Sequence, residues 1–258
     1  MVNLSKRMEA IAAMITQGGI LADVGTDHGY IPIYQVQQNK NKRAIAMDLR
    51  EGPLQRAKEH ILACGLAEQI ETRLSDGVEA LKVGEADTIV VAGMGGELII
   101  HILTEGDAVC HAARELILQP QSEIGGVRRY LRQHGYQIVQ EDMVYEDGKY
   151  YPMMRVISDV TEATPDGIFT ELQMKLCREL QTDGAQVVEL EDLYGPLLLR
   201  DSHPVLSDFL HWQETLLKGI LSGLEKQPDS PKIQNRIGEI SVQLNYNQMA
   251  QKAMTVIL

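Results

Sequence analysis

The stretch Ile20-Leu21-Ala22-Asp23-Val24-Gly25-Thr26-Asp27-His28-Gly29-Tyr30 decides the fold of this chain. An apolar run ends in an acid, two glycines stand four positions apart, and a helix-like segment follows. This order is typical of a buried strand, a tight turn and a helix N-terminus. Glycine lets a backbone approach a ligand closely, and a helix N-terminus offers unpaired N–H groups. The stretch predicts a ligand-binding turn, with a purely structural turn as the alternative.

The turn lacks the features of two common phosphate sites. The dinucleotide fingerprint G-x-G-x-x-G is not met, because Asp27 stands where its second glycine would be. A lysine followed by Ser or Thr is also missing from the turn, so it is not a P-loop. An acid here would repel a pyrophosphate but suits a ligand with a positive centre and hydroxyls. S-adenosylmethionine (SAM) is such a ligand, which makes a nicotinamide oxidoreductase a remote alternative.

The first 160 residues alternate apolar runs with amphipathic segments. We expect an antiparallel pair of strands at its end, joined at Glu146-Asp147-Gly148. This pattern predicts an α/β sheet with right-handed crossovers. The expected strands are 20–24, 43–48, 70–74, 88–92, 115–119, 136–144 and 150–158. The expected helices are 3–17, 32–39, one from about 53, a short one over 78–81, 98–103 and 122–134.

Acidic and glycine residues follow the expected strands. Ligands of such sheets bind beyond the carboxyl ends of the strands. Asp48 lies 25 residues after Asp23, as expected for an acid that grips a ribose, and Asp76 is placed to meet an adenine edge. Either could instead cap a helix or stabilise a turn. The predicted cofactor-binding residues are Asp23, Gly25, Thr26, His28, Asp48, Leu49, Asp76, Gly77, Ala92, Gly93 and Gly95.

The chain changes character at 161–167, a Thr/Glu/Pro/Asp/Gly stretch that reads as a linker. We expect a catalytic domain over 1–160 and a helical domain over 161–258. Shorter helices are expected over 168–181 and about 185–192. Two longer helices near 205–226 and 232–256 carry matching apolar stripes, which predict an antiparallel, coiled-coil-like hairpin.

Composition limits the classes of partner. The net charge of −12 argues against a basic nucleic-acid-binding domain, so RNA would need a confined, salt-sensitive patch. Candidate phosphate contacts are Lys6, Arg7, Arg128, Arg129 and Arg132, although clusters of this kind are more often solvated surface charges. We see no signal peptide and no apolar run of the roughly 20 residues that span a bilayer. The three cysteines form neither a disulfide framework nor a metal clip, so we expect a cytoplasmic protein without a metal.

Several motifs together resemble the bacterial TrmK-type tRNA methyltransferases. They are Leu-Ala-Asp-Val-Gly-Thr-Asp-His-Gly-Tyr-Ile-Pro (21–32), Glu-Gly-Pro-Leu (51–54), Thr-Ile-Val-Val-Ala-Gly-Met-Gly-Gly (88–96), Leu-Ile-Leu-Gln-Pro-Gln (116–121) and Tyr-Gly-Pro-Leu-Leu (194–198). The resemblance implies a Rossmann-like class I SAM-dependent fold with a C-terminal helical domain. It also implies methylation of N1 of adenine 22 in tRNA. Asp48 stands where we expect Glu in relatives, and Gln121 where the family often has Asn.

Methylation of adenine N1 needs alignment more than a strong base, because N1 already carries a lone pair. We expect Tyr30 to stack on the base and Asp27 to face its amino group or the cation that methylation creates. Alternatively, Tyr30 is a half-buried helix residue and Asp27 a helix N-cap. The loop at Gly93 and Met94 predicts a close backbone approach to the base, and Gln119 and Gln121 are further candidate substrate contacts. His28 is expected to be structural rather than a base.

Two other functions remain open at this stage. One is a SAM-dependent enzyme that acts on a small molecule or a protein, and the other is a non-catalytic nucleotide-binding regulatory module. The helical hairpin either docks tRNA or serves as a stabilising or dimerising appendage, so the chain is a monomer or a homodimer.

Overall fold

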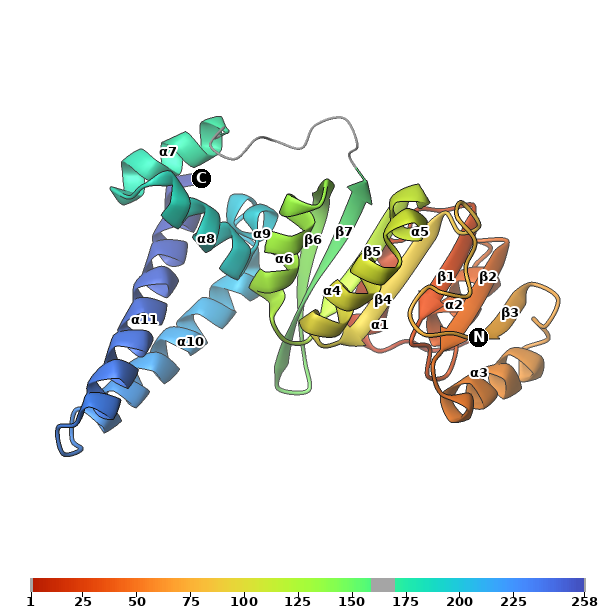
Figure 1. Ribbon diagram of the computed structural model, residues 1–258, viewed down its shortest axis with the longest axis horizontal. Helices are drawn as coiled ribbons and strands as arrows, with labels where there is room; N and C mark the ends of the chain where they lie inside the picture. The colour runs from red at the N-terminus through yellow and green to blue at the C-terminus, as the bar shows by residue number, and fades with distance from the viewer. Residues whose placement is uncertain (1, 159–169, 258) are drawn as a thin grey trace. The chain divides into compact units, whose positions relative to one another are not determined.

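The computed structural model describes residues 2–158 and 170–257. The chain divides into two compact units, residues 1–163 and 164–258. The domain boundary predicted at residues 160/161 lies outside the described residues. Figure 1 colours the first unit from red to green and the second from teal to blue.

One seven-stranded sheet in the order β3-β2-β1-β4-β5-β7-β6 forms the centre of the first unit. Strands β1 to β5 run parallel, and β7 pairs antiparallel with both β5 and β6. The strand order reverses between β1 and β4, the place where ligands bind in open α/β sheets. The predicted α/β sheet is confirmed. The strands are β1 (Ile20–Val24), β2 (Arg43–Asp48), β3 (Ile70–Leu74), β4 (Thr88–Met94), β5 (Glu115–Pro120), β6 (Tyr136–Glu146) and β7 (Lys149–Ser158).

Helices cover both faces of this sheet, because alternate side chains along each strand point to opposite faces. Leu21 and Val90 face the core under α1, α2 and α3. Ala22 and Val91 face the core under α4, α5 and α6, the three helices in front of the strands in Figure 1. The helices are α1 (Lys6–Met14), α2 (Tyr30–Gln37), α3 (Glu51–Ala63), α4 (Gly96–Glu105), α5 (Asp107–Ala112) and α6 (Ile124–Gln133).

One local expectation was wrong, and one helix was not anticipated. Residues 78–81 form turns instead of a helix, and the segment lies between Gly77 and Gly84, both at positive φ. Only six residues lie between these two glycines, too few for a helix that is stable without strong tertiary packing. The six-residue α5, which follows Gly106, was not predicted. Its buried Cys110 shows that packing against the sheet stabilises it, and a periodicity pattern cannot report that over so short a segment.

A buried carboxylate ties the segment after α1 to the sheet. Glu115 is 2% exposed and accepts hydrogen bonds from the Thr16 amide at 2.8 Å, the Thr16 hydroxyl at 2.6 Å and the Thr88 hydroxyl at 2.8 Å. The Arg155 guanidinium lies 3.7 Å from the same carboxylate. This network fixes α1, whose other end reaches the site described below.

Replacing Glu115 with alanine is expected to lower the free energy of unfolding by about 2–4 kcal/mol, since a buried hydroxyl and amide lose their acceptor. Urea denaturation with a constant m-value measures this loss. Glu9→Ala, at an exposed position of α1, is the control and should change stability by less than about 0.5 kcal/mol. Equal losses in the two variants would contradict the assigned role of Glu115.

Five helices form the described part of the second unit. The predicted hairpin is confirmed, with α10 and α11 packed along each other. Asn247 is fully buried and donates hydrogen bonds to the Leu210 carbonyl at 3.0 Å and to Gln213 Oε1 at 2.9 Å. A buried amide of this kind is satisfied in one register of the two helices and not in others. The helices are α7 (Glu171–Leu180), α8 (Gly184–Tyr194), α9 (Pro196–Arg200), α10 (Pro204–Leu224) and α11 (Pro231–Ile257).

Candidate active site

A cavity of about 280 Å³ lies at the carboxyl ends of β1 and β4. The switch between β1 and β4 in the strand order is the reason that a cavity forms at this edge. The turn after β1, the end of β4 and helix α1 all contribute to its wall. Its lining residues are Arg7, Met8, Ile11, Asp23, Gly25, Thr26, Asp27, His28, Tyr30, Ile31, Ala92, Gly93 and Gln121.

The turn after β1 is held by backbone hydrogen bonds and by two glycines. The amides of Gly25 and Thr26 both donate to the Met47 carbonyl at 2.8 Å, which ties the turn to β2. Gly25 and Gly29 have φ of +75° and +67°, a region in which other residues are strained. Gly29 is the N-cap of α2, so the alternative that Asp27 caps this helix is wrong.

Strand β4 carries a bulge at the cavity. Its register with β5 shifts between Ala92 and Met94, and the extra residue, Gly93, has φ of +77°. The Met94 side chain lies against the turn after β1. Its Cε is 2.1 Å from the position that a Cβ would take at Gly25. Of the two predicted catalytic loop residues, only Gly93 lines the cavity, and Met94 packs against the turn.

Asp23 is a buried carboxylate at the bottom of the site, with 7% of its surface exposed. Burial raises the pKa of Asp23 to about 7, the nearby Thr26 side chain lowers it, and the Asp48 carboxylate raises it. The effect of burial on the pKa of Asp23 is therefore larger than the effect of any neighbouring group. A buried carboxylate favours a cationic ligand, because the positive charge of the ligand stabilises the anion that burial has removed from water.

Asp27 stands at the mouth of the cavity with 62% of its side chain exposed. Its Oδ1 accepts a hydrogen bond from Arg56 Nη2 at 2.5 Å, and its Oδ2 lies 3.4 Å from His28 Nε2. The hydrogen bond from Arg56 lowers the pKa of Asp27 below its usual value. Asp27 is thus an anion at the opening of the cavity.

Three rings form a surface beside Asp27. The rings of His28 and Tyr30 are stacked, with centroids 5.2 Å apart and planes at 17°. The His60 ring lies 5.2 Å from His28 and 5.8 Å from Tyr30. Such a surface can stack a flat heterocycle, since aromatic rings pair at centroid separations of this size.

Arg7 reaches the opposite wall from α1. Its Nη1 donates to Gln119 Oε1 at 2.8 Å, and its guanidinium lies 5.2 Å from the Tyr151 ring. Gln119 is fully buried, so the predicted direct substrate contact of Gln119 is wrong, and its side chain instead positions Arg7. Gln121, by contrast, lines the cavity as predicted.

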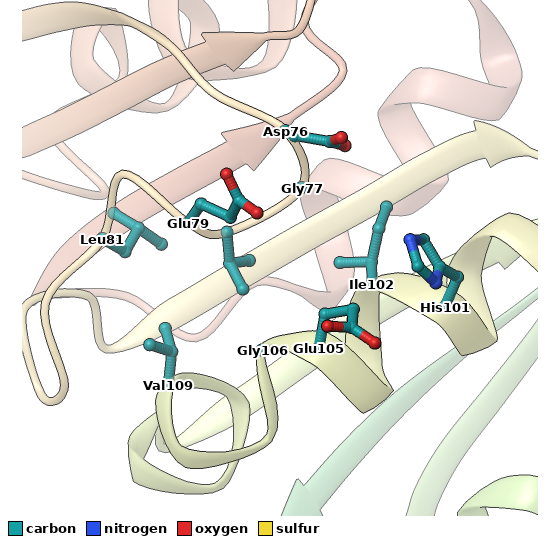
Figure 2. Close-up of a pocket in the computed structure, with 10 residues that line it drawn as sticks. Asp76, Gly77, Glu79, Leu81, His101, Ile102, Glu105, Gly106 and Val109 are labelled. Atoms are coloured by element: carbon teal, nitrogen blue, oxygen red, sulfur yellow. The ribbon is translucent and has the colours of Figure 1, made fainter.

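The remaining predicted cofactor residues continue along the same sheet edge. Asp48 is 7% exposed and accepts a hydrogen bond from the Arg50 amide at 2.7 Å. The next residue, Leu49, is 61% exposed. Asp76 and Gly77 lie on a second cavity of about 270 Å³, between the segment after β3 and helix α4 (Figure 2). Gly95 does not belong to either set of lining residues and is the N-cap of α4.

Within residues 2–158 and 170–257, no group of three or more His, Cys, Asp or Glu side chains is arranged to hold a metal ion. The helices in these two ranges include none that is long and apolar enough to cross a membrane.

Comparison with known proteins identifies the family. Residues 4–154 match the family model described as a methyltransferase domain. The tRNA (adenine(22)-N(1))-methyltransferase of Bacillus subtilis is 40% identical over 167 residues, which are 65% of this chain and 70% of that protein. This chain belongs to the TrmK-type tRNA methyltransferase family.

Solved structures of this family share the fold. The B. subtilis tRNA methyltransferase TrmK has a TM-score of 0.78 at 30% identity, with 97% of this chain and 99% of that chain covered. The structure of Streptococcus pneumoniae Sp1610 in complex with S-adenosyl-L-methionine has a TM-score of 0.73 at 32% identity, with 94% of this chain and 100% of that chain covered. The predicted Rossmann-like class I methyltransferase fold with C-terminal helices is confirmed.

The basic residues predicted to meet phosphates differ in their placement. Arg128 is 3% exposed, and its Nε donates to Glu141 Oε1 at 2.9 Å. A buried guanidinium in an ion pair is unavailable to a phosphate, so the prediction for Arg128 is wrong. Arg129, Arg132 and Lys6 retain some exposure, and their phosphate contacts stay predictions.

Two residues beside this cavity were not anticipated from the sequence. Arg56 and His60 stand four residues apart on α3 and contact the turn after β1. Their spacing places them on one helix face, which is the one available signal. That signal does not say which face turns toward the site, and so did not identify them.

Replacing Gly93 with valine is expected to weaken SAM binding at least tenfold. The new Cβ would lie 3.4 Å from Arg7 Nη1 and 3.6 Å from Gln121 Nε2, which fills the cavity wall. The backbone strain at φ +77° costs about 1–2 kcal/mol of stability. Isothermal titration with SAM and a thermal melt separate the two effects.

Gly84→Val is the matched control, because Gly84 has a similar φ of +74° with no atom within 4 Å of an added Cβ. This variant should show the same backbone strain with normal SAM affinity. An equal loss of SAM affinity in both variants would contradict the expectation that a side chain at Gly93 obstructs the cavity.

Proposed function

We propose that this chain transfers the methyl group of SAM to N1 of adenine 22 in tRNA. The observation that carries the proposal is the cavity at the β1/β4 switch, with Asp27 and Tyr30 at its mouth and Gly93 in its wall, in a member of this family. A named relative acts on this atom of this nucleotide.

The residues along the sheet edge fit SAM. The cofactor carries a sulfonium and an ammonium group, and the buried Asp23 carboxylate suits a positive ligand. Asp48 is placed to accept the ribose hydroxyls, and the exposed Leu49 side chain offers the adenine an apolar surface. Asp76 and Gly77 stand next along the edge, after β3. When bound, SAM supplies a methyl group activated by the positive sulfur.

The chain's own residues then align the two reactants. The N1 lone pair forms the new bond as the methyl–sulfur bond breaks, and the electron pair of that bond goes to sulfur. Efficient transfer needs N1 about 3 Å from the methyl carbon and in line with the breaking bond. The Gly93 bulge leaves room for that approach, and Tyr30 stacks on the base. Asp27 holds the adenine amino group and stabilises the positive charge that the base acquires.

The target base must leave the RNA stack to reach this cavity, because N1 lies on the pairing edge of adenine. The stacked rings of Tyr30 and His28 replace part of the stacking that the base loses. Lys6, Arg7, Arg129 and Arg132 are the phosphate contacts that we propose for the flanking nucleotides.

We propose the domain organisation and the location of the protein together with this function. We infer a catalytic domain over residues 1–160 and a helical domain over 161–258 that docks the folded tRNA by shape. A tRNA-modifying enzyme meets its substrate in the cytoplasm, where we place this chain as a monomer or a homodimer.

Transfer of labelled methyl from SAM to two unmodified tRNA transcripts tests the proposal. One transcript carries adenine at position 22, and its control carries guanine there. We expect label in the first transcript alone, recovered as 1-methyladenosine after digestion. Label in neither would reject the function in favour of a small-molecule or protein methyltransferase. Label in both would reject adenine 22 as the target.

A further inference from the structure

Helix α3 brings a basic and an aromatic side chain, Arg56 and His60, to the mouth of the cavity. Arg56 pairs with Asp27, and the His60 ring extends the stack of His28 and Tyr30. Asp27, His28 and Tyr30 line the cavity, whereas Arg56 and His60 do not. The rings and the guanidinium therefore continue from the cavity wall onto the outer face of α3.

The ion pair between Asp27 and Arg56 is open to solvent. The Asp27 side chain is 62% exposed and that of Arg56 is 48% exposed. Exposed pairs of this kind contribute little to stability, so a competing anion can separate them at low cost. A phosphate is a strong competitor, because the planar guanidinium binds two of its oxygens at once.

The charge of the protein makes such a cation important. At a net charge of −12, the chain as a whole repels RNA, and binding depends on cations placed next to the site. Arg56 lies on one side of the cavity mouth, and Arg7 lines the opposite wall. Arg50, with 78% of its side chain exposed, lies one residue before the start of α3 and adds charge on the Arg56 side.

We propose, on the basis of the function above, that the face of α3 with Arg56 and His60 binds the tRNA strand next to the target adenine. Arg56 leaves Asp27 for a phosphate of that strand, and the freed Asp27 carboxylate turns to the adenine amino group. His60 stacks on the base that neighbours the flipped adenine. RNA binding and the completion of the catalytic site are thereby coupled through one arginine.

Salt-dependent binding of the A22 tRNA transcript tests Arg56. Arg56→Gln is expected to weaken tRNA binding about tenfold at low salt and to reduce the slope of log K against log salt by about one. SAM affinity should stay at the wild-type value. Arg56→Lys should keep most of the slope, since it keeps the charge. Fluorescence anisotropy over a salt series measures these values.

Lys58→Gln is the matched control, because it removes the same charge from an exposed position two residues away on the same helix. It should leave the slope and the affinity unchanged. An Arg56→Gln variant with lower kcat but an unchanged salt slope would overturn the proposal and leave Arg56 as a structural partner of Asp27. Equal losses in the Lys58→Gln variant would overturn it as well, since the effect would then be long-range charge.

Stacking by His60 is tested with a pair of substitutions. His60→Ala is expected to weaken tRNA binding about tenfold, as loss of one stacked base does, and His60→Phe should restore it. Equal weakening in both variants would overturn the stacking role. Wild-type methyl transfer to the same transcript is measured first. Its failure would reject the proposed function together with this inference, whereas an unchanged salt slope in an active enzyme rejects the inference alone.

Discussion

Replacing Asp27 with alanine is expected to lower kcat for tRNA methylation by about a hundredfold to a thousandfold, with SAM affinity close to wild type. The carboxylate stands at the cavity mouth, where methylation creates a positive charge on the base. Removal of one group that stabilises developing charge costs about 2.7–4 kcal/mol of transition-state stabilisation, which corresponds to this range.

Single-turnover methylation of the A22 transcript, with SAM titration beside it, measures the effect of Asp27. Asp27→Asn should recover only a small part of the rate, because the amide accepts a hydrogen bond but carries no charge. Asp107→Ala is the control: Asp107 is similarly exposed at 66% and lies 3.1 Å from its histidine partner, His111, on α5. Normal kcat in Asp27→Ala would disprove the role of this carboxylate in the reaction.

Replacing Asp23 with asparagine is expected to stabilise the free protein while it weakens SAM binding at least tenfold. The pKa of Asp23 in the folded protein is about 7, above the ordinary value of about 3.9 for an aspartate. The folded state therefore holds a proton that the unfolded state has lost, and wild-type stability falls as pH rises from about 4 to 7. The asparagine variant avoids this loss, which amounts to roughly 4 kcal/mol at pH 8.

Thermal or urea unfolding at pH 5, 6, 7 and 8 measures the Asp23 effect, and SAM titration at pH 8 measures binding. The stability gain should grow with pH up to about 7 and then level off. Glu85→Gln is a control of opposite sign, because hydrogen bonds from Arg73 lower the pKa of Glu85 to about 2. It should destabilise the protein above pH 5. A pH-independent difference between Asp23→Asn and wild type would contradict the assignment.

The strands that hold the site could be predicted from local sequence. Ile20–Val24 and Arg43–Asp48 form strands with the predicted bounds, because they lie inside a sheet covered on both faces and read as short, largely apolar runs. Ile70–Leu74, the edge strand, also has the predicted bounds, although three of its five residues are polar. The acids that end them follow from the same reasoning, since parallel strands bring their carboxyl ends to one edge. The short α5 escaped prediction because its stability comes from packing rather than from a repeated pattern.

The amino-acid sequence by itself determined the α/β sheet, the acidic turn at Asp23 and Asp27 and the helical hairpin, since each depends on neighbouring residues along the chain. Only the tertiary structure decided that Arg128 is buried against Glu141, that Gln119 holds Arg7, and that Arg56 meets Asp27. These partners are separated by 13, 112 and 29 residues. Local pattern carries no information about which side chains packing brings together over such separations, because burial and hydrogen-bond partners depend on the whole fold.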